Sequence, residues 1–267
     1  MTAGDVPILM RKQPDAPSLF LPDNLLRQAR RQKAMPAGAV PRVCILDPDG
    51  DMVSYLEQAG RTRPSQTWAC YHTRMHVFTQ GEITYGLVGH AVGASFAVLV
   101  AEELFASGCE LLISMTSAGQ IVAAREPPYF VVIEKALRDE GTSYHYTPPA
   151  AYSHLSPELL GSLRDCQDLV KENLLFGATW TTDAPFRETE TAVAYARSEG
   201  ILGVEMEAAA LYAFSAATRH PVICLAHITN QMGNAENDFE KGDAQGSPAS
   251  LRVIDRIARC WLDRHAV

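Results

Sequence analysis

The stretch VCILDPDGDMVSYLEQA, residues 43–59, contains the change of pattern on which the fold assignment depends. Val43 to Leu46 is a short apolar run typical of a buried strand. Asp47 to Asp51 then forms a turn with a Pro, a Gly and three carboxylates, and no basic residue lies among them. Residues 51–59 predict a helix, so a strand, an acidic turn and a helix follow one another.

The same alternation continues along the chain. Strands are predicted at 43–46, 83–89, 110–115, 129–134, 174–179, 201–204 and 222–229, and helices at 51–59, 93–107, 157–172, 187–198, 205–218 and 248–264. This order predicts a single α/β domain over residues 41–267, with a mixed, mostly parallel sheet flanked by helices. Ligands of such folds bind at the carboxyl ends of the strands, which is where chemistry is expected.

Three segments break this regularity. Residues 1–40 are rich in Pro and polar groups and predict an N-terminal extension whose one short helix lies in PDNLLRQARRQKAM, residues 22–35, with a cap near Asp23. Residues 60–75 and 233–249 are the least regular parts of the domain. The latter, GNAENDFEKGDAQGSP at its start, predicts a mobile loop that could cover a pocket.

Composition excludes several functions. The net charge of -8 and the pI near 5.5 argue against nucleic acid and anionic membranes as partners, because both need a basic surface. We find no signal peptide and no membrane-spanning run, so a soluble cytoplasmic protein is expected. Six widely spaced cysteines are predicted to be reduced core residues, and no cluster suggests a metal site; they are Cys44, Cys70, Cys109, Cys166, Cys224 and Cys260.

Two stretches suggest an anion site and a sugar site. ELLISMTSAG, residues 110–119, places Ser117, Ala118 and Gly119 after a strand, where small residues let backbone N–H groups approach an oxyanion or phosphate. A tight turn explains the same residues. GVEMEAAALY, residues 203–212, has Glu205 and Glu207 around Met206, and an extended backbone would present both carboxylates on one face. A helix N-terminus accounts for one of these glutamates equally well.

LLFGATWTTDAPFR, residues 174–187, suggests a site for a planar base. Phe186 could stack on a heterocycle while Asp183 and Arg187 contact its edge. Alternatively, Asp183 caps the next helix, Pro185 opens its first turn and Trp180 fills the core.

A fourth stretch, LAHITNQM, residues 225–232, ends another apolar run. Within it, His227 is expected to be a buried histidine rather than a ligand. The amide of Asn230 can donate and accept at once, which suits the edge of a nucleobase.

Taken in order, these stretches resemble the nucleoside phosphorylase family, which includes uridine phosphorylases, hexameric purine nucleoside phosphorylases and hydrolytic nucleosidases. The resemblance covers about residues 43–264. It is carried by GVEMEAAALYAF at 203–214, VGHAVGASFAVLVAEEL at 88–104 and ALRDEGTSYHY at 136–146. It implies a barrel-like sheet and a homo-oligomer, built from dimers and possible as a hexamer, whose subunits complete one another's sites. It also implies phosphorolysis of a nucleoside to free base and ribose 1-phosphate, with no metal or organic cofactor.

The resemblance assigns roles to residues of this chain. Glu207 would hold the ribose hydroxyls, with Met206 against the sugar and Glu205 beside it, while Ser117 and the backbone of Ala118 and Gly119 would meet phosphate. Asn230 would contact the base, and an amide there favours uracil or a 6-oxopurine over adenine. Catalysis is assigned to Asn230, Glu207 and Ser117, and the remaining base-site residues are Val92, Gly93, Pro185, Phe186 and Arg187.

The sequence departs from the family where phosphate would bind. Leu46 and Gly50 stand where phosphorolytic members carry the Gly and the Arg of Gly-Asp-Pro-x-Arg, and Ser114 stands where a second Arg is usual. Losing two charge-assisted donors costs about 1.5–3 kcal/mol each. A third phosphate ligand, given across the subunit interface, corresponds to Arg74 or His72, and Arg125 or Arg187 could also supply charge. Hydrolysis by water is therefore the alternative activity, and a nucleoside-binding protein without catalysis is the third hypothesis.

Overall fold

The computed structural model describes residues 6–166, 174–231 and 241–265. The strands are β1 (Val43–Asp47), β2 (Arg63–Pro64), β3 (Met75–Gln80), β4 (Ile83–Gly89), β5 (Leu111–Gln120), β6 (Tyr129–Asp139), β7 (Tyr152–His154), β8 (Leu175–Thr182), β9 (Gly203–Glu205) and β10 (Val222–Gln231). The α-helices are α1 (Pro22–Lys33), α2 (Asp51–Gln58), α3 (Ala94–Ala106), α4 (Pro157–Arg164), α6 (Glu190–Ser198), α7 (Ala208–Thr218) and α8 (Ser247–Arg264). Short 3₁₀ helices are η2 (Pro7–Leu9), η3 (Ser143–His145), η4 (Pro185–Arg187) and η5 (Asp243–Gly246).

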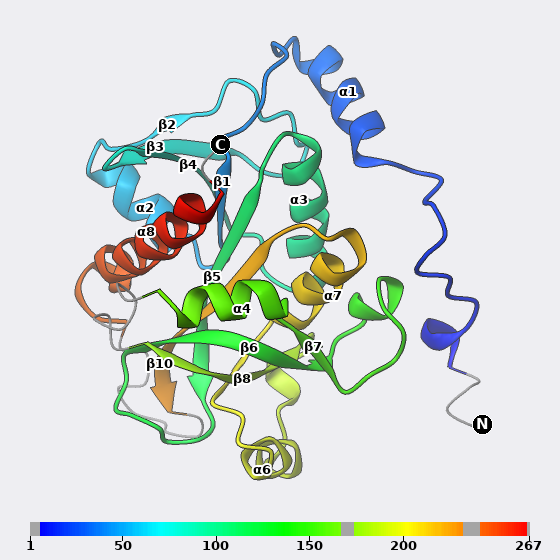
Figure 1. Cartoon of the computed structure of the whole chain (residues 1–267), viewed down its shortest axis with the longest axis vertical. Coiled ribbons are helices and arrows are strands. Elements are labelled where there is room, and N and C mark those ends of the chain that lie inside the picture. Colours follow the sequence, from blue (N-terminus) through cyan, green and yellow to red (C-terminus); the bar gives the residue numbers. More distant parts are fainter. Residues whose placement is uncertain (1–5, 167–173, 232–240, 266–267) are drawn as a thin grey trace.

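One sheet organises the domain, in the order β10-β6-β8-β9-β5-β1-β4-β3-β2. β10 also pairs with β5, so β5, β10, β6, β8 and β9 close into a ring, and β1, β4 and β3 extend the sheet beyond it. Pairs β1–β4, β1–β5, β5–β10, β6–β8 and β8–β9 are parallel, whereas β10–β6, β5–β9 and β3–β4 are antiparallel. The predicted single α/β domain with a mixed, barrel-like sheet is confirmed (Figure 1).

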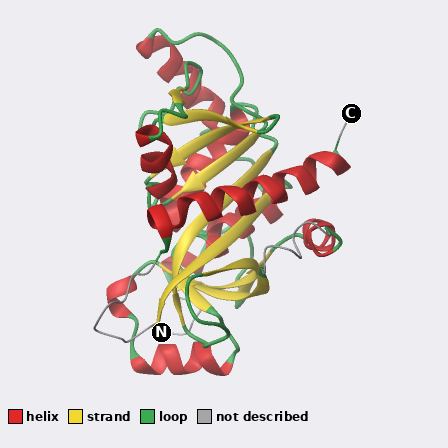
Figure 2. Cartoon of the chain, turned by 90° about the vertical axis from the view of Figure 1, so that its left-hand side faces the viewer, coloured by secondary structure: helices red, strands yellow, loops and turns green. Residues whose placement is uncertain are grey.

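Helices cover the sheet because their apolar residues need a partner surface. α7, AAALYAFSAAT, is buried from Ala208 to Ser215, and its many alanines let it pack closely against α3. α8 packs against both α2 and α4. Figure 1 places these helices together, and Figure 2 shows α8, the long helix that leads to the C-terminus, lying across one face of the strands. The parallel strands β1, β5 and β10 lie between these layers, so their carboxyl ends meet at one edge.

Most predicted elements are present, and some bounds differ. β5 and β6 run five residues beyond the predictions, because their polar ends continue to pair with neighbouring strands. β2, β3 and β7 were not predicted. α7 begins at Ala208 rather than at residue 205, because Glu205 still belongs to β9.

The less regular segments differ from the prediction in part. The predicted N-terminal helix is α1, which buries Leu26 and Ala29 beside Ala69; it begins at Pro22, and Asp23 lies in its first turn without capping it. α4 ends at Arg164, and the rest of the helix predicted for 157–172 lies mainly outside the described residues. Of the predicted loop 233–249, residues 233–240 are also outside them, whereas residues 243–249 form η5 and the start of α8.

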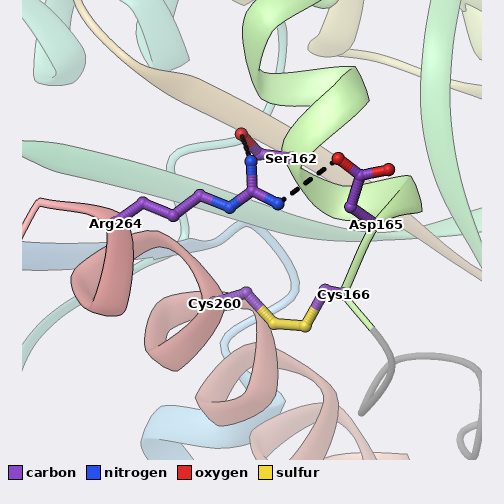
Figure 3. The surroundings of a disulfide bond; sticks show 5 residues. All are labelled: Ser162, Asp165, Cys166, Cys260 and Arg264. Carbon is purple, nitrogen blue, oxygen red and sulfur yellow. Dashed lines mark hydrogen bonds and ion pairs between the residues drawn. A yellow bond between two sulfur atoms is a disulfide. The ribbon is translucent and has the colours of Figure 1, made fainter.

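The prediction that all six cysteines are reduced is wrong for one pair. Cys166 and Cys260 form a disulfide between the end of α4 and α8, with Cα atoms 6.2 Å apart (Figure 3). Arg264 adds contacts from α8 to Ser162 (3.1 Å) and Asp165 (3.4 Å) of the α4 segment. Sequence spacing could not reveal this pair, since 94 residues separate the cysteines and the packing of α4 on α8 brings them together. The other four cysteines are buried thiols.

Across the described parts of the chain, no helix combines the length and the apolar character needed to span a membrane.

Candidate active site

Asp47, the first carboxylate of the acidic turn, has a structural role. Its side chain is buried, and its Oδ2 accepts a hydrogen bond from the Val53 backbone N–H (3.0 Å), which fixes the first turn of α2. Burial, together with the charges of Asp49 and Asp51, raises the pKa of Asp47 to about 7 despite this hydrogen bond. Asp47 therefore anchors the turn that carries the two following carboxylates.

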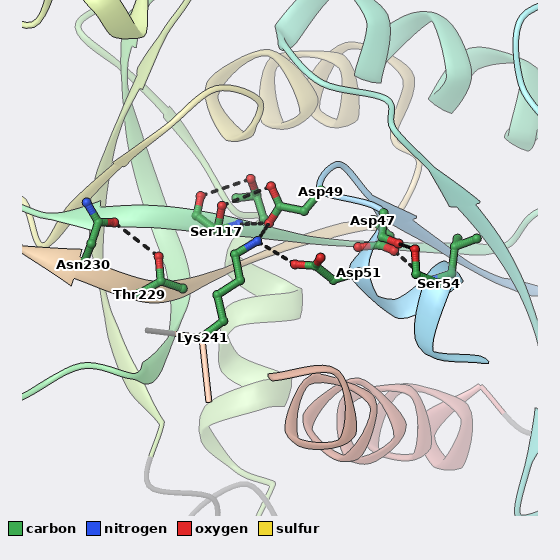
Figure 4. Close-up of polar contacts among 11 residues, drawn as sticks. Asp47, Asp49, Asp51, Ser54, Ser117, Thr229, Asn230 and Lys241 are labelled. Carbon is green, nitrogen blue, oxygen red and sulfur yellow. Dashed lines mark hydrogen bonds and ion pairs between the residues drawn. The ribbon is translucent and has the colours of Figure 1, made fainter. Parts of the chain in front are cut away.

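Asp49 fills the predicted anion site. β1 and β5 are parallel neighbours, so the turn after β1 lies beside Ser117 near the end of β5. The Ser117 hydroxyl donates to Asp49 Oδ1 (3.1 Å), and the Ser117 backbone N–H donates to Asp49 Oδ2 (3.2 Å) (Figure 4). Ser117, which was predicted to meet phosphate, thus binds a carboxylate of the same chain through both its hydroxyl and its own backbone N–H.

Lys241 completes this cluster and was missed by the sequence analysis. Its Nζ lies 3.2 Å from Asp49 Oδ2 and 2.5 Å from Asp51 Oδ2, and only 16% of its side chain is exposed. Burial alone would lower the pKa of Lys241, but Asp51 and Asp49 raise it overall. The ammonium is therefore charged, and two carboxylates face it. Lys241 is 192 residues from Asp49 in the sequence, and its place in a polar loop carried no signal of this contact.

A small polar cavity lies beside these carboxylates. Its volume is about 20 Å³, which is the room of one water molecule. Asp49, Asp51, Ser117 and His227 are among its lining residues. His227 is buried and stacks on Phe130, and burial with the nearby ammonium lowers its pKa to about 4, so the imidazole is neutral.

Glu207 offers an acceptor for a sugar hydroxyl. Its Oε1 accepts the Gly93 backbone N–H (2.7 Å), while its buried Oε2 has no hydrogen-bond partner among the described residues. Burial first, and then the charge of Glu205, raise the pKa of Glu207 to about 8. A buried carboxyl oxygen without a hydrogen-bond partner is costly, and a ligand hydroxyl would satisfy it.

The predicted ribose contact of Glu205 does not fit the structure. Its Oε1 accepts the hydroxyls of Thr179 (3.0 Å) and Thr181 (2.5 Å), and its Oε2 accepts the backbone N–H groups of Glu207 (2.7 Å) and Ala208 (2.8 Å). Glu205 therefore holds the start of α7 in place. Its parity with Glu207 is lost because the strand ends at Glu205 and the chain turns into the helix.

Of the residues predicted to bind the base, Asn230 lies at this edge of the sheet, whereas most of the others are exposed. Asn230 pairs in register with Gly119 on β5, and its Oδ1 accepts the Thr229 hydroxyl (3.2 Å). Met206 is half-buried beside Glu207. The remaining residues predicted to bind the base are half-buried, as Gly93 is, or exposed: Val92 and the η4 residues Pro185, Phe186 and Arg187. Ala118, which was predicted to meet phosphate, is buried in β5.

Arg74, the predicted phosphate ligand from across an interface, is exposed just before β3. We find no contact between Arg74 and Ser117 or Asp49 in the described parts of this chain.

Fold and site together define an α/β enzyme with a polar pocket at the carboxyl ends of its parallel strands. A profile of the phosphorylase superfamily matches residues 41–259. A guanosine phosphorylase of Halorubrum lacusprofundi is 30% identical over 173 residues, covering 63% of this chain and 68% of the relative. The chain therefore belongs to the phosphorylase superfamily.

Solved structures support the fold. A uridine phosphorylase of Vibrio fischeri ES114, in complex with 6-hydroxy-1-naphthoic acid, superposes with a TM-score of 0.67 at 20% identity, covering 83% of this chain and 92% of its own. A second structure of that enzyme superposes with a TM-score of 0.66 at 19% identity, covering 83% of this chain and 93% of its own. The predicted nucleoside phosphorylase fold is thus confirmed.

Proposed function

We propose that this protein cleaves the N-glycosidic bond of a nucleoside and transfers the ribosyl group to water, giving a free base and ribose. Membership of the phosphorylase superfamily supports glycosidic-bond cleavage. The relatives are named guanosine phosphorylase and uridine phosphorylase, and the bases of guanosine and uridine both carry carbonyl groups. Asn230, whose amide can donate to a carbonyl, is consistent with a base of this kind.

The observation that carries the choice of water is the position of the Asp49 carboxylate. It occupies the donors of Ser117, and a one-water cavity lies beside it. A phosphate dianion would have to displace this carboxylate and approach Asp51 as well, with Lys241 as the only cation seen in contact with them among the described residues. Water needs no such displacement.

The proposed mechanism uses each group once. As the glycosidic bond breaks, the sugar gains positive charge and the base gains negative charge. Glu207 binds a ribose hydroxyl through Oε2, Asn230 donates a hydrogen bond to the departing base anion, and Asp49 accepts a proton from the attacking water. The base anion takes a proton from solvent as it leaves, and Asp49 returns its proton to solvent, so the products are the neutral base and ribose. Lys241 keeps Asp49 oriented toward Ser117 and stabilises its negative charge until the proton arrives.

Phosphorolysis is the second candidate, because relatives of this chain are named phosphorylases and Lys241 brings one positive charge to the anion site. Inorganic phosphate would then be the co-substrate, and Arg74 of a neighbouring subunit would be a further ligand in the homo-oligomer that we also propose. Gly50 argues against phosphorolysis, because it stands where phosphorolytic members carry the phosphate-binding Arg of Gly-Asp-Pro-x-Arg. Its φ is +78°, and a Cβ there would lie 2.0 Å from the His90 ring.

A nucleoside panel assayed with and without phosphate tests the proposal. We expect guanosine, inosine or uridine to release base in phosphate-free buffer, with ribose as the second product and the isotope of ¹⁸O-labelled water at its C1 hydroxyl. Turnover that requires phosphate and yields ribose 1-phosphate would overturn the choice of water. No turnover, combined with a nucleoside-induced rise in melting temperature, would instead support a non-catalytic nucleoside-binding protein.

A further inference from the structure

A second cleft lies apart from the proposed active site. Its volume is about 730 Å³, within the range of small-molecule sites. It is bounded by residues 147–150, the first turn of α4 and the C-terminal ends of α7 and α8, and it shares no lining residue with the cavity beside Asp49. Nothing in the proposed reaction uses it.

Two polar groups in the wall of this cleft are buried and unpaired. Trp261 is 5% exposed, and its indole Nε1–H has no acceptor among the described residues. Ser153 is 6% exposed, and its hydroxyl has no partner there either. Both residues line the cleft, one from α8 and one from β7. A buried polar group without a partner is costly, so a ligand that hydrogen-bonds to these two groups would be stabilised in this cleft.

The chemistry of the cleft selects an uncharged ligand. The buried cation in its lining, Arg138, already donates to the Ser143 hydroxyl (2.7 Å) and the Pro148 carbonyl (2.8 Å). The other charged residues in the lining, Arg219 and Glu158, are exposed and of opposite sign. The lining therefore presents no unpaired buried charge to a carboxylate or phosphate. The unpaired groups are an indole N–H, which only donates, and a hydroxyl, which does both.

The walls select a flat ligand. They include prolines and rings, among them Pro148, Pro149, Pro157, Pro221, His220 and Trp261. Rings and prolines suit the faces of a planar molecule. We propose that this cleft is a second binding site for a neutral planar heterocycle with a carbonyl acceptor, of the size of a nucleobase or nucleoside, held by Trp261 and Ser153.

Nuclear magnetic resonance of ¹⁵N-tryptophan-labelled protein tests this site directly. The chain has three tryptophans, so the Trp261 indole signal can be assigned with Trp261→Phe. The probes are hypoxanthine and uracil, titrated to about 10 mM, which covers weak binding. We expect a saturable shift of the Trp261 signal with at least one base. Ser153→Ala should weaken that binding about tenfold, as expected for one lost hydrogen bond. Ser198→Ala, an exposed serine on α6, serves as the matched control.

The outcomes separate this site from the active site. Asp49→Asn should leave the Trp261 titration unchanged, and the site stands even if no nucleoside is turned over. Absence of any shift with either base, or Ser153→Ala without effect, would overturn the proposal. A shift of the Trp261 signal with benzoate but with neither base would overturn the proposal that the ligand is neutral. A change of sedimentation coefficient in Trp261→Phe would show that a second copy covers the cleft, and would likewise reject it.

Discussion

Replacing Asp49 by Asn removes the carboxylate that fills the anion site while keeping the size of the side chain. The amide oxygen can still accept the Ser117 backbone N–H, but the ion pair with Lys241 is lost, and so is the group that accepts a proton from water. A general base contributes about 10²- to 10⁴-fold. We therefore expect base release in phosphate-free buffer to fall by about this factor, while KM for the nucleoside changes little, because Asp49 contacts no proposed ribose ligand.

The same substitution should make the site more tolerant of phosphate. Two carboxylates face one ammonium in the native cluster, and Asp49→Asn leaves one of each. Removing a negative charge about 4 Å from a bound anion relieves about 1 to 4 kcal/mol per unit of anion charge, between fully solvated and partly buried limits. Phosphate should therefore bind at least about tenfold more tightly to the variant, measured by calorimetry and by inhibition or activation of turnover.

The control for both effects is Asp23→Asn, which neutralises an exposed carboxylate on α1. A rate for Asp49→Asn within about threefold of the native rate would refute the assignment of Asp49 as the base. Unchanged phosphate affinity would refute the argument that its carboxylate keeps phosphate out of the Ser117 site.

Three further predictions follow from the site and the packing. At pH 9, above the pKa of about 8 at which Glu207 ionises, Glu207→Gln keeps the contact with the Gly93 N–H but loses a charge-assisted bond of about 1.5–3 kcal/mol, so kcat/KM should fall about 10- to 150-fold while the melting temperature does not fall. A wild-type kcat/KM at this pH would reject Glu207 as the ribose ligand. Asp47 ionises near pH 3.8 when unfolded and near 7 when folded, so the folded state binds more protons between these values and the free energy of unfolding should fall as pH rises through them. Denaturant melts at several pH values should show that this free energy depends less on pH in Asp47→Asn than in the native protein. An identical pH dependence in both proteins would contradict the pKa shift. Cys260→Ser should lower the free energy of unfolding by about 2–5 kcal/mol when no reductant is present. In reductant, the native protein should unfold with the same free energy as this variant. Equal stability of the two proteins without reductant would exclude the disulfide.

The sequence was sufficient for the elements with strong local patterns. The apolar run of β1 and the periodic apolar residues of α8 predict their own type, whatever they pack against. β7 has three residues and exists because it pairs with β6, so its formation depends on tertiary contacts that no local pattern contains. The bounds of β5 and β6 were short for the same reason.

The site was predictable to the extent that it follows from strand adjacency. Residues after β1 and near the end of β5 must meet when these strands are parallel neighbours, which brings Asp49 to Ser117. Lys241 arrives from a segment 192 residues away, and the burial that raises the pKa of Glu207 depends on the packing of α7. Neither is encoded in the spacing of nearby residues.

The three carboxylates of the acidic turn now have separate explanations. Asp47 fixes the turn, Asp49 occupies the Ser117 donors, and Asp51 shares Lys241 with Asp49. The turn itself depends on Gly50, because its positive φ is unfavourable for side chains other than Gly and because the His90 ring occupies the space of a Cβ. An Arg at this position would therefore require a different backbone and a displaced His90. The acidic anion site is thus built into the course of the chain after β1, and changing one residue of the turn would not restore a phosphate site of the family's usual kind.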